Sequence, residues 1–133
     1  MCFQTTQMPA MHFAFPDVCK TLVVLAVVPI PYPNIGMTST SIPTIFNQFT
    51  MCMPDHNLLT MTPLSNGDEP GLLMGLISNL IVGPILPLFG SIKVFKTIMP
   101  AIKMLSLTGQ NGVILNMVGM TLTPSQVKLL ICS

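Results

Sequence analysis

Apolar residues in this 133-residue chain gather in short runs that prolines and glycines interrupt. The run from Leu22 to Val28 is apolar throughout and rich in β-branched valine, which predicts one β-strand that ends at Pro29. From Pro29 to Asn34 every second residue is a proline, so this segment must be extended and can lie only at a sheet edge or in a connector. Thirteen prolines and nine glycines leave few stretches long enough for a helix. The pattern predicts a mainly β fold.

An internal repeat is the most informative feature of the pattern. Residues 49–54 align with residues 95–100, and each copy is followed by an Asn-Gly pair, at Asn66-Gly67 and at Asn111-Gly112. Asn-Gly favours tight turns because both residues tolerate positive φ. Each copy is therefore predicted to be a strand, a break at Met-Pro, a second strand and a turn. The chain should contain two β-hairpin units of one design.

Residues 71–92 lie between the two copies and carry no charge, which makes the segment long enough for a membrane-spanning helix. Prolines and glycines interrupt it, and no basic cluster flanks it to set an orientation. We therefore expect a short helix or apolar loop over 72–82 that packs against the sheet or a partner, and no stable insertion into a membrane. A small integral membrane protein inserted through 71–92 is the alternative.

Charged residues make up only 7% of the chain, against about 25% in ordinary soluble proteins, while 50% of residues are hydrophobic and the mean hydropathy is +0.73. The length fits one domain, residues 1–133. This number of charged residues is too small to cover the surface of such a domain. We therefore expect protein or lipid to cover part of that surface. Nucleic acid is excluded as a partner, because five scattered lysines and a net charge of +1 give no basic patch.

Neither a secretion signal nor a catalytic motif is present in the sequence. Residues 1–7 lack the basic start and apolar core of a signal peptide, so the chain is expected to begin in the cytoplasm with reduced thiols. No serine elbow, metalloprotease helix or phosphate-binding glycine loop occurs, and the four carboxylates are scattered. We expect a protein that is not an enzyme.

Several ordered blocks, spread over nearly the whole chain, resemble the PAAR-like proteins of bacterial type VI secretion systems. These blocks are 15–21, 28–35, 53–58, 65–68, 99–101 and 123–128. The resemblance implies a small cone or prism of β-hairpins with approximate threefold symmetry. Its broad base would dock on a trimeric VgrG-type spike protein, one copy per trimer, and its point would pierce the target membrane. Such a protein is cytoplasmic during assembly and is then secreted or injected on the spike tip.

Base contacts in such a cone should be apolar and lie in the hairpins, which selects Phe49, Met51, Phe95 and Ile98 as candidate spike-binding residues. The chain ends at Ser133 without an added toxin domain, which favours a standalone tip. A compatible alternative is an adaptor that recruits a separate effector toxin or its chaperone. The apolar residues that would form its partner face are Leu72, Leu76, Leu88 and Phe89.

Zinc is the candidate cofactor, because PAAR-type cones resemble zinc-stabilised tips. Zinc prefers four ligands drawn from cysteine thiolate and histidine. Cys52 and His56 are close enough in sequence to reach one ion across a turn, and His12 with Cys19 or Cys132 would complete the set. The favoured interpretation is different. It makes His56 a structural histidine in a turn, His12 a partly buried filler, and isolated cysteines small buried residues.

Overall fold

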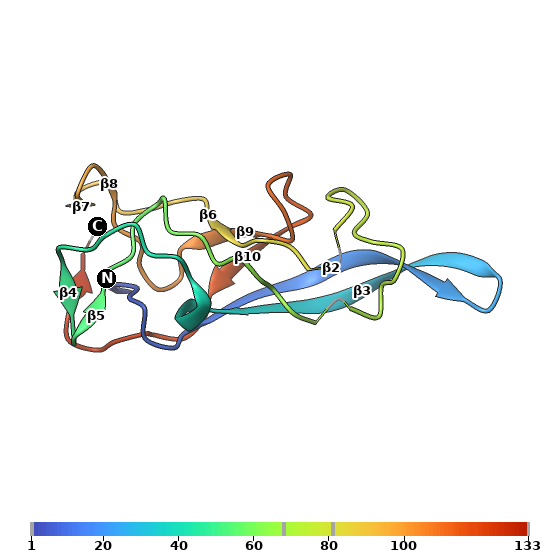
Figure 1. The fold of residues 1–133 in the computed structure, drawn as a ribbon, viewed down its shortest axis with the longest axis horizontal. Coiled ribbons are helices and arrows are strands. Elements are labelled where there is room, and N and C mark those ends of the chain that lie inside the picture. The colour runs from blue at the N-terminus through green and yellow to red at the C-terminus, as the bar shows by residue number, and fades with distance from the viewer. Residues whose placement is uncertain (1, 68, 81, 133) are drawn as a thin grey trace.

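The computed structural model describes residues 2–67, 69–80 and 82–132 and has a mainly β fold, as the sequence predicts. Antiparallel pairing accounts for every strand in this part of the chain (Figure 1). The strands are β1 (Cys2–Phe3), β2 (Met11–Val23), β3 (Ala26–Met37), β4 (Phe49–Thr50), β5 (Met53–Pro54), β6 (Leu86–Pro87), β7 (Phe95–Lys96), β8 (Met99–Pro100), β9 (Leu107–Gln110), β10 (Met117–Thr121) and β11 (Leu130–Ile131), with a 3-10 turn η1 at Thr38–Thr40.

One five-stranded sheet, in the order β3-β2-β10-β9-β6, forms the body of the molecule. Its two edges are connected by residues 61–66 through isolated bridges, from Thr62 to Ile85 and from Asn66 to Ile35, without a continuous ladder. The proline-rich segment lies in β3, at the edge of the sheet. This position confirms the edge that the sequence predicts, because proline cannot donate to a central ladder.

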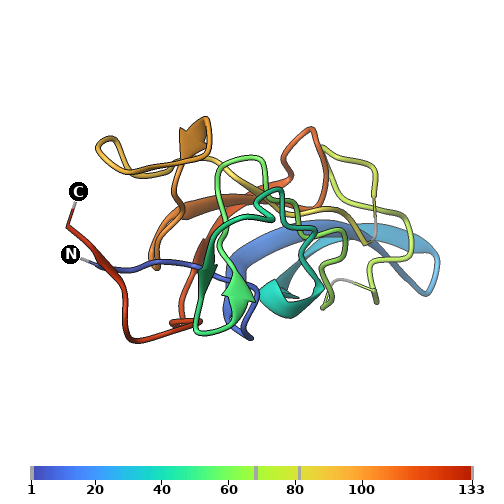
Figure 2. The same cartoon turned by 60° about the vertical axis from the view of Figure 1, so that its left-hand side comes forward.

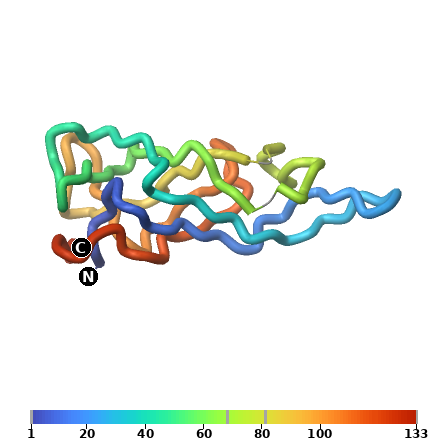
Figure 3. The backbone as a smooth tube through the Cα atoms, turned by 60° about the horizontal axis from the view of Figure 1, so that its bottom comes forward, coloured from blue at the N-terminus to red at the C-terminus, as the bar shows by residue number. Residues whose placement is uncertain are grey.

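The β2–β3 hairpin runs out of the body as a long two-stranded ribbon, and the molecule tapers from a broad end toward it (Figures 1 and 3). The ladder continues to the pair Val23–Ala26, and the turn is at Val24 and Leu25. The prediction of one strand over 22–28 is therefore wrong: two strands and a turn share this run. The turn contains no glycine, asparagine or aspartate, so it gives no turn signal. We call residues 21–28 the arm.

Two short hairpins, β4–β5 and β7–β8, lie at the broad end, and their registers match, with Phe49 opposite Pro54 and Phe95 opposite Pro100. The repeat therefore does encode two hairpins of one design. Each hairpin falls within the six-residue segment, however, so the predicted strand up to Met-Pro is wrong. In the first hairpin the turn residues Met51 and Cys52 both adopt positive φ, of 53° and 62°, without glycine.

Of the two forms predicted for 72–82, the structure shows the apolar loop and not the helix, since the described residues of this range form turns; residue 81 lies outside them. Their backbone groups bond to β2 instead: Lys20 N donates to Met74 O, and Leu73 N donates to Lys20 O. Met74 also adopts a φ of 73°, which an α-helix does not allow. In the described part of the chain, no helix is long and apolar enough to span a membrane.

The interior of the molecule is unusually polar. Buried Thr, Ser, Asn, Gln and His side chains outnumber the buried hydrophobic ones, whereas many large hydrophobic side chains are exposed. The buried polar groups are joined by hydrogen bonds such as Ser41–Thr62 and His12–Thr121. Hydrogen bonding is what makes such burial tolerable. The apolar surface that the composition predicts is therefore present, and large exposed apolar areas of this kind are typical of interaction surfaces.

Candidate functional site

A ring of three chain segments occupies the broad end. Three backbone hydrogen bonds run around it in one sense. Thr5 N donates to Ile102 O (3.0 Å), Ile102 N to His56 O (3.4 Å), and His56 N to Thr5 O (3.1 Å). Each segment thus donates to one neighbour and accepts from the other, as a threefold axis requires. We call residues 3–7, 54–58 and 100–104 the ring segments.

Two further sets of contacts also link the three segments in a closed cycle, and in the second set the donors run in the opposite sense. One consists of three antiparallel bridges and the other of three backbone hydrogen bonds, each set linking the same three segments. The bridges are Gln4–Lys103, Thr6–Asp55 and Asn57–Ala101. The hydrogen bonds are Gln7 N to Pro54 O, Leu58 N to Pro100 O and Met104 N to Phe3 O. The ring therefore has approximate threefold pseudo-symmetry.

Each ring segment begins in a short two-stranded corner. Two corners are the hairpins β4–β5 and β7–β8, and the third is the pair β1–β11, which joins the two ends of the described chain. Their registers correspond, with Phe3 opposite Leu130 where the hairpins have Pro54 opposite Phe49 and Pro100 opposite Phe95. Figure 2 shows the hairpins and both termini spread around this end.

One exposed apolar side chain occupies the same position in each corner. Phe49 is 59% exposed, Phe95 57% and Leu130 45%. These three residues correspond through the register, because each lies opposite the first residue of a ring segment, Pro54, Pro100 or Phe3. The broad end therefore presents three equivalent apolar contacts around a pseudo-threefold axis. We call Phe49, Phe95 and Leu130 the corner residues.

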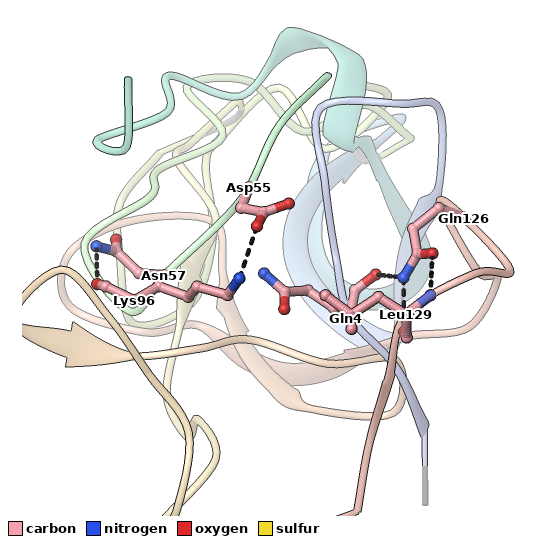
Figure 4. Close-up of polar contacts among 6 residues, drawn as sticks. All are labelled: Gln4, Asp55, Asn57, Lys96, Gln126 and Leu129. Atoms are coloured by element: carbon pink, nitrogen blue, oxygen red, sulfur yellow. Dashed lines mark hydrogen bonds and ion pairs between the residues drawn. The ribbon is translucent and has the colours of Figure 1, made fainter. Parts of the chain in front are cut away.

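Buried polar contacts hold the corners to the ring (Figure 4). Lys96 Nζ lies 2.9 Å from Asp55 Oδ2, and Asp55 is only 1% exposed, so the pair ties the β7–β8 corner to another ring segment. Gln126 Nε2 donates to Gln4 O and Leu129 O, which fixes the third corner to the amino-terminal segment. These contacts fix two of the three corners to the ring.

Comparison with protein families identifies the domain. The model of the Toxin PAAR-like domain matches residues 10–119. The chain belongs to this family. No curated protein and no solved structure matches it. Membership indicates a role associated with the type VI spike or with its toxins, in a family whose members are structural.

The candidate spike-binding residues of this PAAR-like domain all lie at the broad end. Phe49 and Met51 belong to one corner and Phe95 and Ile98 to another, and all four are exposed. Sequence reasoning missed Leu130. The internal repeat shows only two copies, because the third corner is divided between residues 2–3 and 130–131.

Two histidines of the PAAR-like domain line one small cavity together with Thr5 and Ile102. His56 Nε2 donates to Gln7 Oε1 at 2.8 Å, and His12 Nδ1 lies 2.9 Å from Thr121 Oγ1. Burial lowers the pKa of His12 from 6.5 to about 4. Burial, and then the nearby His12, lower the pKa of His56 to about 3. Both side chains therefore stay neutral at physiological pH.

The structure does not assemble the expected zinc ligands. Cys52 is exposed in the β4–β5 turn, Cys132 is exposed near the carboxyl end, and Cys19 is buried in β2, away from the residues that line the histidine cavity. Within the described residues, no three or more His, Cys, Asp or Glu side chains group around a common point. Two histidines with hydroxyl neighbours do not fit a four-ligand zinc site. Zinc binding stays a prediction for metal analysis.

The four residues expected to form a partner face belong to two separate loops of the PAAR-like domain. Leu72 and Leu76 are exposed in the turns that pack along β2, where Leu76 N donates to Val18 O. Leu88 and Phe89 follow β6, where Leu88 N donates to Leu107 O. Phe89 is exposed and Leu88 is half-buried. An effector contact at these residues stays a prediction.

Proposed function

We propose that this protein is a structural spike tip, which caps a trimeric VgrG-type spike with its broad end and directs its narrow end toward the target membrane. One copy binds one trimer. The observation that supports this function is the pseudo-threefold ring with its three equivalent corner residues. A single chain meets three identical chains most economically when its own surface repeats three times around the same axis.

The chemistry of the broad end fits such a partner. Phe95 and Leu130 project from corners that buried contacts hold to the ring, and Phe49 lies in a ladder opposite Pro54 of a ring segment, so little conformational freedom is lost on docking. Aromatic and aliphatic side chains of this kind are the usual anchors of protein interfaces. Met51 and Ile98 extend the same apolar surface at two of the corners.

Co-expression with a candidate trimeric spike protein, followed by native mass spectrometry, tests the function. The expected species is one copy of this chain on one trimer, and metal analysis of the same sample tests for zinc. Phe49→Glu, Phe95→Glu and Leu130→Glu should each weaken the complex by at least about 10-fold, because each buries a charge in one third of the interface.

Val113→Glu is the matched control, since Val113 is 76% exposed but belongs to the loop between β9 and β10. It should leave the complex intact. A stoichiometry other than one per trimer, or corner variants that bind as well as Val113→Glu, would exclude docking through the broad end.

A further inference from the structure

The arm at the opposite end from the corners is apolar on both faces. Its tip residues Val24 and Leu25 are 87% and 95% exposed. Leu22 and Val23 point to opposite faces of the ribbon and are 54% and 45% exposed. A protein groove would cover one face of such a ribbon, whereas this arm offers apolar side chains all round. A surrounding such as lipid, which contacts the arm on every side, would cover all of these side chains.

The arm stands apart from the body of the molecule. The turns of residues 71–76 follow β2 as far as Lys20, whose N–H donates to Met74 O. Beyond Lys20, and among the described residues, the hydrogen bonds of the arm stay within the β2–β3 hairpin. The arm is therefore a free projection that can enter another phase without unpacking the fold.

The length of the arm corresponds to one leaflet of a lipid bilayer. From the Thr21–Val28 pair to the turn it spans about four residues, or about 13 Å at the rise of an antiparallel strand. The hydrocarbon core of a bilayer is about 30 Å thick, so one leaflet is about 15 Å. The cross-strand ladder satisfies the backbone groups that face the partner strand, whereas those on the two outer edges of the ribbon stay open, which favours a short, tip-first entry over a membrane-spanning one.

Polar side chains suited to a membrane interface lie where the arm begins. Thr21 and Tyr32 are hydrogen-bonded there at 2.9 Å, and Tyr32 is the only tyrosine of the chain. Lys20 is adjacent, and its long side chain can keep its charge in water while its stem lies along apolar groups. Tyrosine and lysine at the boundary of an apolar segment are typical of membrane anchoring.

The turn chemistry gives independent support. Val24 adopts a φ of 58°, a conformation that glycine or asparagine adopts easily and a β-branched residue does not. The tip therefore keeps a large apolar side chain at a position where it strains the backbone. Retained strain of this kind is typical of functional segments.

We propose that the arm inserts into the outer leaflet of a lipid bilayer, with Leu22 to Val28 in the hydrocarbon and Tyr32 and Lys20 at the interface. This inference rests on the proposed function, in which the narrow end meets the target membrane. Insertion reaches no deeper than one leaflet, and it involves a different part of the chain from residues 71–92. Because the arm is uncharged, zwitterionic lipid is sufficient.

The chain contains no tryptophan, so one tryptophan reports on one position. Leu25→Trp, mixed with phosphatidylcholine vesicles, should show a blue shift of its emission and stronger quenching by lipids brominated deep in the chain than by lipids brominated near the headgroup. Ile92→Trp is the control, because Ile92 is 86% exposed in the loop before β7. Its emission should not change with vesicles.

A tip variant, Val24→Gly with Leu25→Asn, should reduce vesicle partitioning by about 100-fold, since two buried aliphatic side chains are lost. Glycine and asparagine both suit the turn, so the circular dichroism of the variant should match that of the parent. Ile92→Asn should partition like the parent.

Three outcomes would overturn the inference. They are unchanged Leu25→Trp emission with vesicles, equal partitioning of the tip variant, and a dimer in solution whose Leu25→Trp emission is already blue-shifted without lipid. The assay needs no spike protein, and the corner variants do not involve the arm. Loss of lipid binding with intact trimer binding would therefore reject the arm alone, and the reverse result would reject the docking function.

Discussion

The broad end and the arm are both built from antiparallel hairpins, but they distribute polar and apolar groups in opposite ways. At the broad end, buried polar side chains such as Asn57 and Gln126 bond to the backbone of neighbouring segments, and three corners depend on one ring. In the arm, apolar side chains face outward and, among the described residues, the hydrogen bonds stay within the hairpin. The first region is specified by contacts within the fold, and the second needs a partner outside it.

Breaking the ring should have the largest effect of any single change. Thr5→Pro removes the N–H that donates to Ile102 O, and with it one third of the cyclic set. We expect a loss of about 3 kcal/mol or more in the free energy of unfolding, measured by urea denaturation. Thr5→Ala keeps the N–H and should cost clearly less.

Urea denaturation of a variant with a shortened arm compares the arm with the ring. Replacing residues 22–27 with Asn-Gly joins the cross-strand pair Thr21–Val28 by a favourable two-residue turn. We expect a change of less than about 1 kcal/mol in unfolding free energy, because an exposed hairpin tip buries little apolar surface. A shortened arm that destabilises the protein as much as Thr5→Pro would show that the two regions are not independent.

Breaking the buried ion pair should rank next. Lys96→Met leaves the Asp55 carboxylate unpaired at 1% exposure and should cost about 3 kcal/mol in urea denaturation. Combining Lys96→Met with Asp55→Asn should recover part of that loss, because the buried charge is removed. Lys93→Met, at an exposed site in the same region, should change stability by less than about 0.5 kcal/mol. Equal effects of the two lysine variants would mean that the pair does not hold the corner.

Acidification should weaken the broad end through its two histidines. The pKa values of His12 and His56 fall from 6.5 to about 4 and about 3 on folding. Near pH 6.5 the two histidines therefore become protonated in the unfolded chain but stay neutral in the folded protein. Above that pH both states hold the histidines neutral, so burial carries no protonation cost. The free energy of unfolding falls as the pH drops below it. We expect a loss of about 2 kcal/mol per histidine between pH 7 and pH 5.

Urea denaturation at a series of pH values measures this dependence, and His56→Asn should roughly halve it. The arm contains no titratable group, and vesicle partitioning of the folded protein should hardly change over the same range. Stability that is flat from pH 7 to pH 5 would contradict the neutral state of the buried histidines.

The sequence predicts those features of the fold that recur within it. The copies at 49–54 and 95–100 disclosed two corners, and Phe49 and Phe95 followed from them. Leu130 could not be predicted, because its corner pairs two segments at opposite ends of the chain and shares no recognisable pattern with the others. Register across the ring depends on tertiary hydrogen bonds, which no local pattern records.

Turns and polar burial limited the rest of the prediction. The run from Leu22 to Val28 reads as one strand because its turn residues are valine and leucine, which carry no turn propensity. His12 and His56 are far apart in sequence yet line one cavity, whereas Cys52, expected beside His56, is exposed in a turn. Sequence spacing predicts a common site only where the segment between the two residues stays regular.

The smallest expected effect is a change of stability at the tip of the arm. It is informative because it separates the contribution of the tip residues to stability from their contribution to membrane binding. Val24→Gly relieves the positive φ at the tip and should raise the free energy of unfolding by about 0.5–1 kcal/mol. Val23→Gly, in the regular ladder next to it, should lower it by a similar amount. Each variant removes one valine side chain from the arm, so both should weaken vesicle binding. If Val24→Gly destabilises the protein as Val23→Gly does, the tip is not strained, and the turn loses its value as evidence for a membrane contact.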